Sequence, residues 1–527
     1  MHRVDLDRRL VLRGGLAAGS LFLSAPYAWI WAQSEGTMKL LRAPKVALVL
    51  GNSKYKQAPL KNPANDAKAM ADALKACGFD VTLKMDGGKA DMAAAVQAYV
   101  QTLTARKCIG LFYYAGHGIQ LAWRNYMLPV DADLDTLADI QKQGVEVNSL
   151  LEGITKAANP MNVIILDACR DNPFGSLKGV DHKGLSQMDA PNNTIISYAT
   201  APGNVASDGE GANGLYTENL LRELKVPEAK VEDVFKRVRL NVRLKSKGAQ
   251  VPWDSSSLED DFYFLPPAQL QKLSQAEKDR LLNEELAAWD RAREAKDPKL
   301  IEAFLQRYPG GNFSELAQLA LDRALAENGE KKIEAASTLG NPYTKGSART
   351  DIDYKVGDSY TYRVVNANTG AERRTLTDTV TQITDSEVIT DSGRVTDLLG
   401  NLLRHRDGRR LTTNQTYPLE FSVGKRWNSG WFVTNAAGVR FRNESEFKIA
   451  AREKLTVPAG TFDAFRLEQR GIVTGGPMGP FEVIATYWLD PARLRSYAAY
   501  TDIRKWDRWQ NSTGVAERYE LVSFKQS

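Results

Sequence analysis

Short apolar runs alternate with stretches of helical periodicity between residues 45 and 265. Apolar runs of the buried-strand type occupy residues 46–50, 79–83, 108–114, 163–166 and 194–198. Apolar positions that recur every three or four residues predict helices at 64–76, 90–103, 147–157, 215–224 and 231–244. Strands that alternate with helices indicate an α/β sandwich with a mainly parallel sheet. In such a sheet the active site belongs at the carboxyl ends of the strands.

The pattern becomes purely helical after Pro266 and Pro267. Residues 268–336 are rich in Ala, Leu, Glu, Lys and Arg, and they carry an amphipathic stripe at Leu281, Leu282, Leu286 and Trp289. A break at residues 308–313 separates paired helices that resemble one tetratricopeptide-type unit. One unit cannot build a solenoid, so we expect this region either to pack or dock a partner, or to act as a spacer.

A strand-rich pattern fills the remainder of the chain. Residues 337–349 contain Gly and Pro and read as a linker. Residues 350–527 form short alternating segments separated by Gly, Asp or Pro, which predicts an antiparallel all-β domain, either a sandwich or a barrel. No nucleophile, metal cluster or phosphate loop is evident in this part of the sequence.

Residues 1–32 have the build of a bacterial export signal. Arg8 and Arg9 precede an apolar run rich in Gly and Ala at residues 14–32, which is typical of the twin-arginine route. The alternative, a short buried helix, is disfavoured by the glycines and a proline in the run. We therefore expect a periplasmic or cell-envelope protein, with an N-terminal membrane anchor if the signal is not cleaved.

Composition narrows the function classes. The 527 residues are 43% hydrophobic and 25% charged, which excludes a wholly disordered or collagen-like chain and requires several domains. The net charge of +5 is small and spread out, so we expect no nucleic-acid partner. Three cysteines and four histidines are too few for a typical zinc module, and we predict no metal site. Cys77 and Cys108 are expected to be packing residues.

Two of the predicted strands end in residues that suit covalent catalysis. One ends in Gly116-His117-Gly118 and the other in Asp167-Ala168-Cys169-Arg170. The histidine precedes the cysteine by about 50 residues, which is the spacing of caspase-type enzymes, and the Ala-Cys-Arg triplet is shared with them. Residues 45–265 therefore resemble the caspase and metacaspase superfamily of cysteine peptidases, in particular its bacterial caspase-like branch.

The resemblance assigns roles to these residues. It implies that Cys169 is the nucleophile and that His117 is the general acid and base. The backbone N–H groups of Gly118 and Cys169 would form the oxyanion hole. The alternative is a caspase-like fold without turnover, acting as a scaffold or interaction protein of the bacterial envelope. Retention of both dyad residues favours the peptidase.

Acidic residues predict the specificity. Asp167 stands where caspases have a Gln, and Asp66 resembles the second acidic residue of a metacaspase pocket. Carboxylates would bind a guanidinium through charge-assisted hydrogen bonds, so the resemblance implies cleavage after Arg, or after Lys. Asp208 follows the strand at 194–198, where the family lines the same pocket. Asp66 could instead be a helix N-cap and Asp208 part of a surface turn.

Three expectations concern activation and partners. The Gly-containing loop at residues 172–193 is predicted to be exposed and is a candidate for self-cleavage. No acidic loop has EF-hand spacing, so we predict no cofactor and leave calcium activation open. The partner of the active site is a protein or peptide substrate. The helical and β-domains are candidates for binding an envelope partner.

Overall fold

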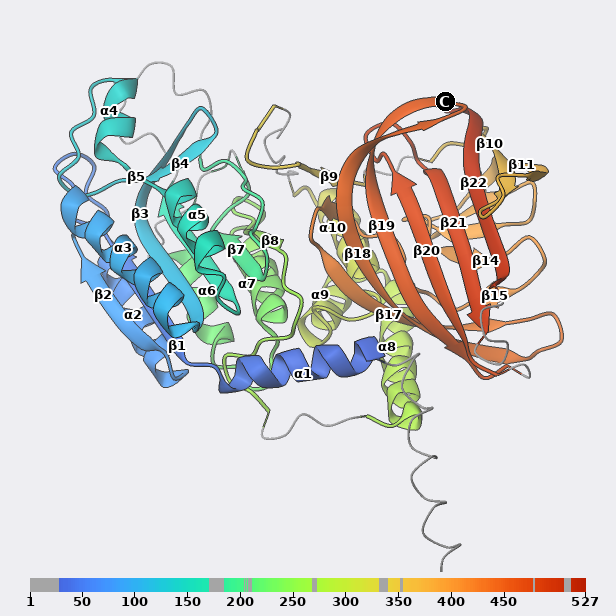
Figure 1. The fold of residues 1–527 in the computed structure, drawn as a ribbon, viewed down its shortest axis with the longest axis horizontal. Coiled ribbons are helices and arrows are strands. Elements are labelled where there is room, and N and C mark those ends of the chain that lie inside the picture. Colours follow the sequence, from blue (N-terminus) through green and yellow to red (C-terminus); the bar gives the residue numbers. More distant parts are fainter. Residues whose placement is uncertain are drawn as a thin grey trace, which may run out of the picture.

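The computed structural model gives the arrangement of most of the chain. The described residues are 28–169, 184–202, 204, 206, 211–267, 273–330, 340–350, 354–476, 479–506 and 513–527. They form an α/β domain, a set of three helices and a closed β-barrel, in that order along the chain (Figure 1). The predicted fold class is confirmed, and of the two architectures proposed for the all-β domain the structure has the barrel. Most of the predicted export signal and Asp208 lie outside the described residues.

An eight-stranded sheet forms the centre of the α/β domain. Its main path is β2–β1–β3–β6–β7–β8. These strands span Lys45–Gly51 (β1), Asp80–Met85 (β2), Ile109–Leu121 (β3), Asn162–Cys169 (β6), Thr194–Tyr198 (β7) and Trp253–Ser256 (β8). All neighbours from β2 to β7 are parallel, and β8 is antiparallel to β7. The central strands read as continuous apolar runs because both faces of the sheet are covered.

Helices cover the two faces of the sheet. One face carries α2 (Pro63–Ala76), α6 (Leu215–Glu223) and α7 (Val231–Lys245), and the other carries α3 (Lys89–Arg106) and α5 (Val147–Ala157). Successive residues of β3 enter opposite cores, as Tyr113 and Tyr114 do. The remaining elements of this part are α1 (Ala28–Arg42), β4 (Arg124–Met127), α4 (Leu137–Gln143) and β5 (Val145–Glu146).

Three helices stand between the α/β domain and the barrel (Figure 1). They span Gln275–Ala295 (α8), Pro298–Arg307 (α9) and Ser314–Glu327 (α10). The side chain of Asp297 caps α9 by accepting a 2.9 Å hydrogen bond from the backbone of Lys299. In the predicted stripe, Leu282 and Trp289 are buried as expected. The prediction is wrong for Leu281, which is 40% exposed because it lies off the face that packs on the neighbouring helices.

Twelve antiparallel strands close into the C-terminal barrel. They span Ser359–Asn366 (β10), Glu372–Ile383 (β11), Glu387–Thr390 (β12), Val395–Asp397 (β13), Leu402–Arg404 (β14), Arg410–Leu411 (β15), Arg426–Thr434 (β17), Arg440–Val457 (β18), Gly460–Thr474 (β19), Phe481–Leu489 (β20), Tyr497–Trp506 (β21) and Thr513–Lys525 (β22). Pairing of β22 with β10 closes the ring. Two short strands, β9 (Ser347–Arg349) and β16 (Glu420–Ser422), pair separately. Closure removes the exposed edges that an open sheet would present.

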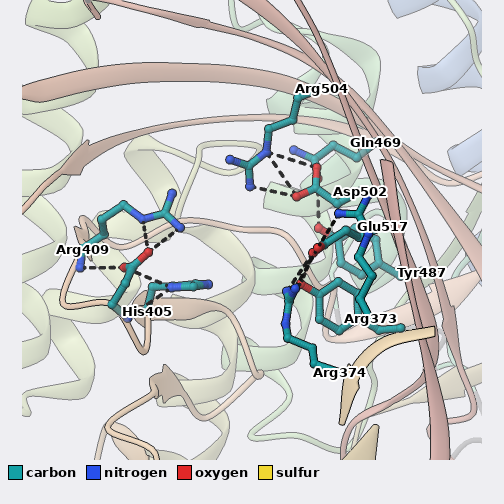
Figure 2. A network of polar contacts seen from close by, with 11 residues as sticks. Arg373, Arg374, His405, Arg409, Gln469, Tyr487, Asp502, Arg504 and Glu517 are labelled. Carbon is teal, nitrogen blue, oxygen red and sulfur yellow. Dashed lines mark hydrogen bonds and ion pairs between the residues drawn. The ribbon is translucent and has the colours of Figure 1, made fainter. Parts of the chain in front are cut away.

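Charged side chains of the barrel are arranged in pairs. Asp502 and Glu517 are opposite each other in the β21–β22 ladder, where two like charges would repel. Arg504 contacts Asp502 at 2.8 Å, and Arg374 contacts Glu517 at 2.9 Å. Figure 2 shows these arginines pointing at the two carboxylates. Arginine pairing therefore permits the two acids to lie on adjacent strands.

Helix α7 joins the three units through two arginines. Arg239 contacts Asp254 of β8 at 3.1 Å and Glu420 of β16 at 3.0 Å. One turn later, Arg243 contacts Asp322 of α10, and it reaches Glu330 at 2.5 Å. The Arg243 side chain is only 14% exposed. Because ion pairs shielded from water are screened less than surface pairs, these contacts hold the units in one arrangement.

We expect the Arg243→Met substitution to destabilise the protein by about 2–4 kcal/mol, because it leaves the carboxylate of Glu330 without its arginine in a mostly buried site. Scanning calorimetry of the full chain measures this as a lower melting temperature. The control is Lys296→Gln, which breaks the ion pair between Lys296 and Asp385. The side chains of these two residues are 71% and 82% exposed, respectively. The melting temperature of this control should stay near that of the parent, because an ion pair in full contact with solvent contributes little to stability. Equal decreases in melting temperature for the two variants would contradict the inference that Arg243 joins the units.

Candidate active site

His117 and Cys169 lie at the carboxyl ends of adjacent parallel strands. The register of β3 and β6 places the Cα of His117 opposite the Cα of Cys169. Residues 170–183 and the side chain of Cys169 lie outside the described part of the structure. The fold thus brings together two positions that are about 50 residues apart in the sequence. The catalytic roles of these residues and the oxyanion hole remain predictions.

The glycines that flank His117 are required by close packing within the protein. Gly116 has a φ of +155°, and a Cβ there would lie 2.6 Å from the hydroxyl oxygen of Tyr55. A Cβ on Gly118 would lie 2.9 Å from the Cβ of Ala168 and 3.0 Å from Cδ2 of Leu185. A side chain at either position would therefore displace its neighbours. After Gly116, β3 continues as the partner of β4.

The imidazole of His117 is buried and held in one orientation. The residue is 4% exposed, and its ring lies 4.4 Å from the ring of Tyr55. Its Nε2 is 2.7 Å from the carbonyl oxygen of Ala58. Because a carbonyl oxygen only accepts, the hydrogen of the neutral ring belongs on Nε2, and Nδ1 is then the basic nitrogen. The backbone N–H of His117 donates to the Tyr55 hydroxyl at 2.9 Å.

The predicted pocket acids Asp66 and Asp167 are linked by the start of helix α6. Asp66 is 3% exposed and accepts hydrogen bonds from the side chain of Asn213 at 2.8 Å and the backbone N–H of Gly214 at 3.0 Å. Asp167, which is more exposed, accepts a 2.6 Å hydrogen bond from the hydroxyl of Thr217. Both carboxylates thus contact the first residues of one helix, whose positive dipole end favours negative charge.

Both acids, Asp66 and Asp167, influence the side chain of Tyr113. Its hydroxyl is 2.6 Å from that of Thr217 and 3.4 Å from the Asp167 carboxylate. Burial, and then the negative charges of Asp167 and Asp66, raises the pKa of Tyr113 well above its usual value. The alternative that Asp66 is the N-cap of its own helix is wrong, because Asn62 is the N-cap of α2. Asp66 instead faces the N-terminus of α6.

The two other cysteines are packing residues, as predicted. Cys77 and Cys108 are buried in the cores on opposite faces of the sheet. Burial raises the pKa of both thiols. A buried thiol with a raised pKa supplies little thiolate, so neither suits a nucleophile. Cys169 is the remaining cysteine of the three in the sequence.

The predicted exposed loop at 172–193 needs a correction. Within it, residues 185–188 are each at most 3% exposed. Their backbone polar groups are satisfied inside the protein; for example, Asn125 exchanges hydrogen bonds of 2.7 and 2.8 Å with the N–H and carbonyl of Ser186. The polar composition of the loop led to the prediction that it is exposed. Of residues 185–188, only Leu185 and Met188 are apolar and so favoured burial. Sequence reasoning also missed Tyr55 and Ala58, which belong to an irregular segment without any periodic pattern.

Among the described residues, no group of three or more His, Cys, Asp or Glu side chains is arranged to hold a metal ion. No helix in the same part of the chain is long and apolar enough to cross a membrane.

Comparison with known proteins identifies the α/β domain. A family model described as the caspase domain matches residues 44–263. Residues 44–263 form a caspase domain. This chain is 28% identical over 203 residues, 37% of its length, to the human mucosa-associated lymphoid tissue lymphoma translocation protein 1 (Homo sapiens). Its Mus musculus homolog is 29% identical over 201 residues, 36% of this chain.

These matches are limited to one region of each protein. The aligned region covers 24% of the human relative and 23% of the mouse relative, so this chain spans about a quarter of the length of each. The matches support a caspase-like peptidase. The family match ends at residue 263, so it carries no information about the three helices or the barrel.

We expect Tyr55→Phe to destabilise the caspase domain by about 1–3 kcal/mol, because it removes the acceptor for the buried His117 N–H. The lost hydroxyl also contacts the carbonyl of Leu128 at 3.1 Å. A matched control is Tyr99→Phe, since the buried Tyr99 hydroxyl has no hydrogen-bond partner among the described residues. Denaturation of both variants should show a loss for Tyr55→Phe only. An equal loss of stability in Tyr99→Phe would contradict a stabilising role for the hydrogen bond between the Tyr55 hydroxyl and the backbone N–H of His117.

Proposed function

We propose that this protein is an exported caspase-type cysteine endopeptidase that cleaves peptide bonds after Arg or Lys. The observation that carries the proposal is the in-register pairing of His117 with Cys169 at the carboxyl edge of the sheet. The carbonyl of Ala58 supports it further, because it fixes the imidazole from the Nε2 side. A nucleophile, a base and a group that orients the base are the three parts that thiol catalysis needs.

In the proposed reaction His117 takes the proton of the Cys169 thiol, and the sulfur attacks the carbonyl carbon of the substrate. The resulting oxyanion accepts hydrogen bonds from the backbone N–H groups of Gly118 and Cys169. The protonated imidazole then donates its proton to the leaving amine, and the C–N bond breaks to give a thioester. Water deprotonated by His117 attacks the thioester, which releases the acid product and restores the thiol.

The proposed specificity is supported by the acids around Tyr113. Asp167 is the better placed to meet a substrate, because it is more exposed than Asp66 and lies in β6 two residues before the strand ends at Cys169. Asp66 adds negative charge behind it and holds the start of α6 through Gly214. A guanidinium or ammonium group would gain from both charges, whereas an acidic side chain would be repelled.

We further propose that the protein acts in the periplasm or cell envelope. The twin-arginine motif at Arg8 and Arg9 supports export, and that route carries folded proteins, which suits an enzyme with a reactive thiol. The three helices and the barrel would then restrict substrates or bind an envelope partner.

Hydrolysis of fluorogenic peptides tests the activity directly. Purified protein without residues 1–27 should hydrolyse Arg and Lys peptides under reducing conditions, and Cys169→Ala and His117→Ala should each lower kcat/KM by at least about 1000-fold. Cys77→Ala, a change to a buried thiol of raised pKa, is the matched control and should retain activity. No turnover by the folded parent protein, with and without calcium, would instead support the envelope scaffold.

Charge removal tests the pocket. We expect Asp167→Asn to lower kcat/KM for Arg peptides by about 10–100-fold, the value of one charged hydrogen bond, through a higher KM. Asp66→Asn should act in the same direction. Asp80→Asn is the control, because its carboxyl is 69% exposed at the edge strand β2, where it pairs with Arg106. Equal rates on Arg and Asp peptides before and after substitution would contradict an acidic pocket.

A further inference from the structure

A buried irregular segment lies against the strand ends of the candidate active site. Residues 184–190 form neither helix nor strand, and residues 185–188 are at most 3% exposed. Leu185 packs on Gly118 and on the region of Ala168, which are the neighbours of His117 and Cys169. The position of this segment therefore defines one wall beside the predicted dyad.

A strap formed by residues 341–347 holds the outer side of this segment. Asn341 donates from its side chain to the carbonyl of Gln187 at 2.9 Å. The Asp189 carboxylate accepts from the hydroxyl of Thr344 at 2.6 Å and from the backbone N–H of Lys345 at 2.8 Å. The backbone N–H of Asp189 also donates to the carbonyl of the strap residue Tyr343, at 3.1 Å.

Further contacts connect the strap with the caspase domain. The hydroxyl of Ser347 donates to the side-chain oxygen of Gln187 at 3.0 Å. The guanidinium of Arg124, in β4 of the caspase domain, lies 5.0 Å from the centre of the Tyr343 ring. Such a set of contacts between segments about 155 residues apart is far denser than a passive linker needs.

The strap is rigidly connected to the accessory part of the chain. It continues directly into β9, which pairs with β16. Arg452 of the barrel strand β18 donates to the carbonyl of Lys345 at 2.9 Å. The barrel therefore fixes the strap, and the strap contacts residues 187–189 by side-chain and backbone hydrogen bonds.

We propose that the strap positions the 184–190 segment for catalysis, so that turnover in the caspase domain depends on its attachment to the barrel. This inference rests on the proposed peptidase function. Asn341, Thr344 and Asp189 act as positioning residues through Leu185. Without the strap, the buried Gln187 loses partners for its carbonyl and its side-chain oxygen and Asp189 loses the partners of its carboxylate, so the wall beside Gly118 is no longer held in one conformation.

The test uses the full chain without residues 1–27, carrying Asn341→Ala together with Thr344→Val. Hydrogen exchange of the peptide containing residues 185–190 should become at least about tenfold faster, while β3 and β6 exchange as before. For an Arg peptide, kcat should fall at least about fivefold with a smaller change in KM. Thr344→Ser keeps the hydroxyl and should keep both values near those of the parent.

A matched control is the pair Asn435→Ala and Thr361→Val, which removes exposed side-chain hydrogen bonds from the barrel without touching the strap. It should leave exchange at 185–190 and kcat unchanged. Melting temperatures of both double variants show whether either effect arises from general unfolding. A loss of kcat accompanied by global unfolding is resolved by the Thr344→Val single variant, which leaves Asn341 in place and deletes only the hydroxyl that donates to Asp189 and accepts from the N–H of Gly346.

The possible failures are distinguishable. Unchanged exchange at 185–190 overturns the anchoring role of the strap. Faster exchange with unchanged kcat overturns the positioning role, and the peptidase function stands. If the parent protein has no turnover, the proposed function fails, and the rate of Cys169 alkylation by iodoacetamide replaces kcat as the readout. A strap variant that alters this rate less than about twofold then overturns the inference as well.

Discussion

The in-register parallel pairing of β3 with β6 is the constraint on which the candidate site depends. Parallel strands end at the same edge of a sheet, so a residue at the end of one strand meets the end of its neighbour. The pairing of His117 with Cys169 follows from a register that begins with Gly110 opposite Asn162. Packing on both sheet faces sets this register, since a slip by one residue would send each apolar side chain of β3 into the opposite core, which is packed around different side chains.

Irregular segments complete the site, and hydrogen bonding holds them in place. The chain that contains Tyr55 and Ala58 reaches His117 through a backbone contact and a ring contact. On the other side, Asn125 and the strap hold residues 185–189. Buried loops must satisfy their polar backbone groups within the protein, and here side chains from distant elements do so. The candidate site is thus built from parts that no single sequence window contains.

The accessory units are integrated with the caspase domain. Arg239 of α7 forms an ion pair with Glu420 of the short strand β16, and Arg243 forms one with Asp322 of the third helix. A buried apolar cluster includes Leu240 of α7 together with Phe304 and Phe432 of the other two units. Interfaces that are both apolar and ion-paired permit less relative motion than a flexible linker. These interfaces hold the strap in place relative to the caspase domain.

Local pattern determined much of this protein. Continuous apolar runs and helical spacing predicted the strands and helices of the α/β domain and the helical region, and alternating segments predicted an antiparallel all-β domain, because each element must bury its apolar side chains. The Gly-His-Gly and Ala-Cys-Arg motifs at strand ends located the candidate dyad and led to the caspase resemblance. Only the tertiary structure decided that the all-β domain closes into a barrel, that residues 185–188 are buried and that Asp66 faces helix α6. These outcomes depend on contacts between residues far apart in the chain, which periodicity within one segment does not encode.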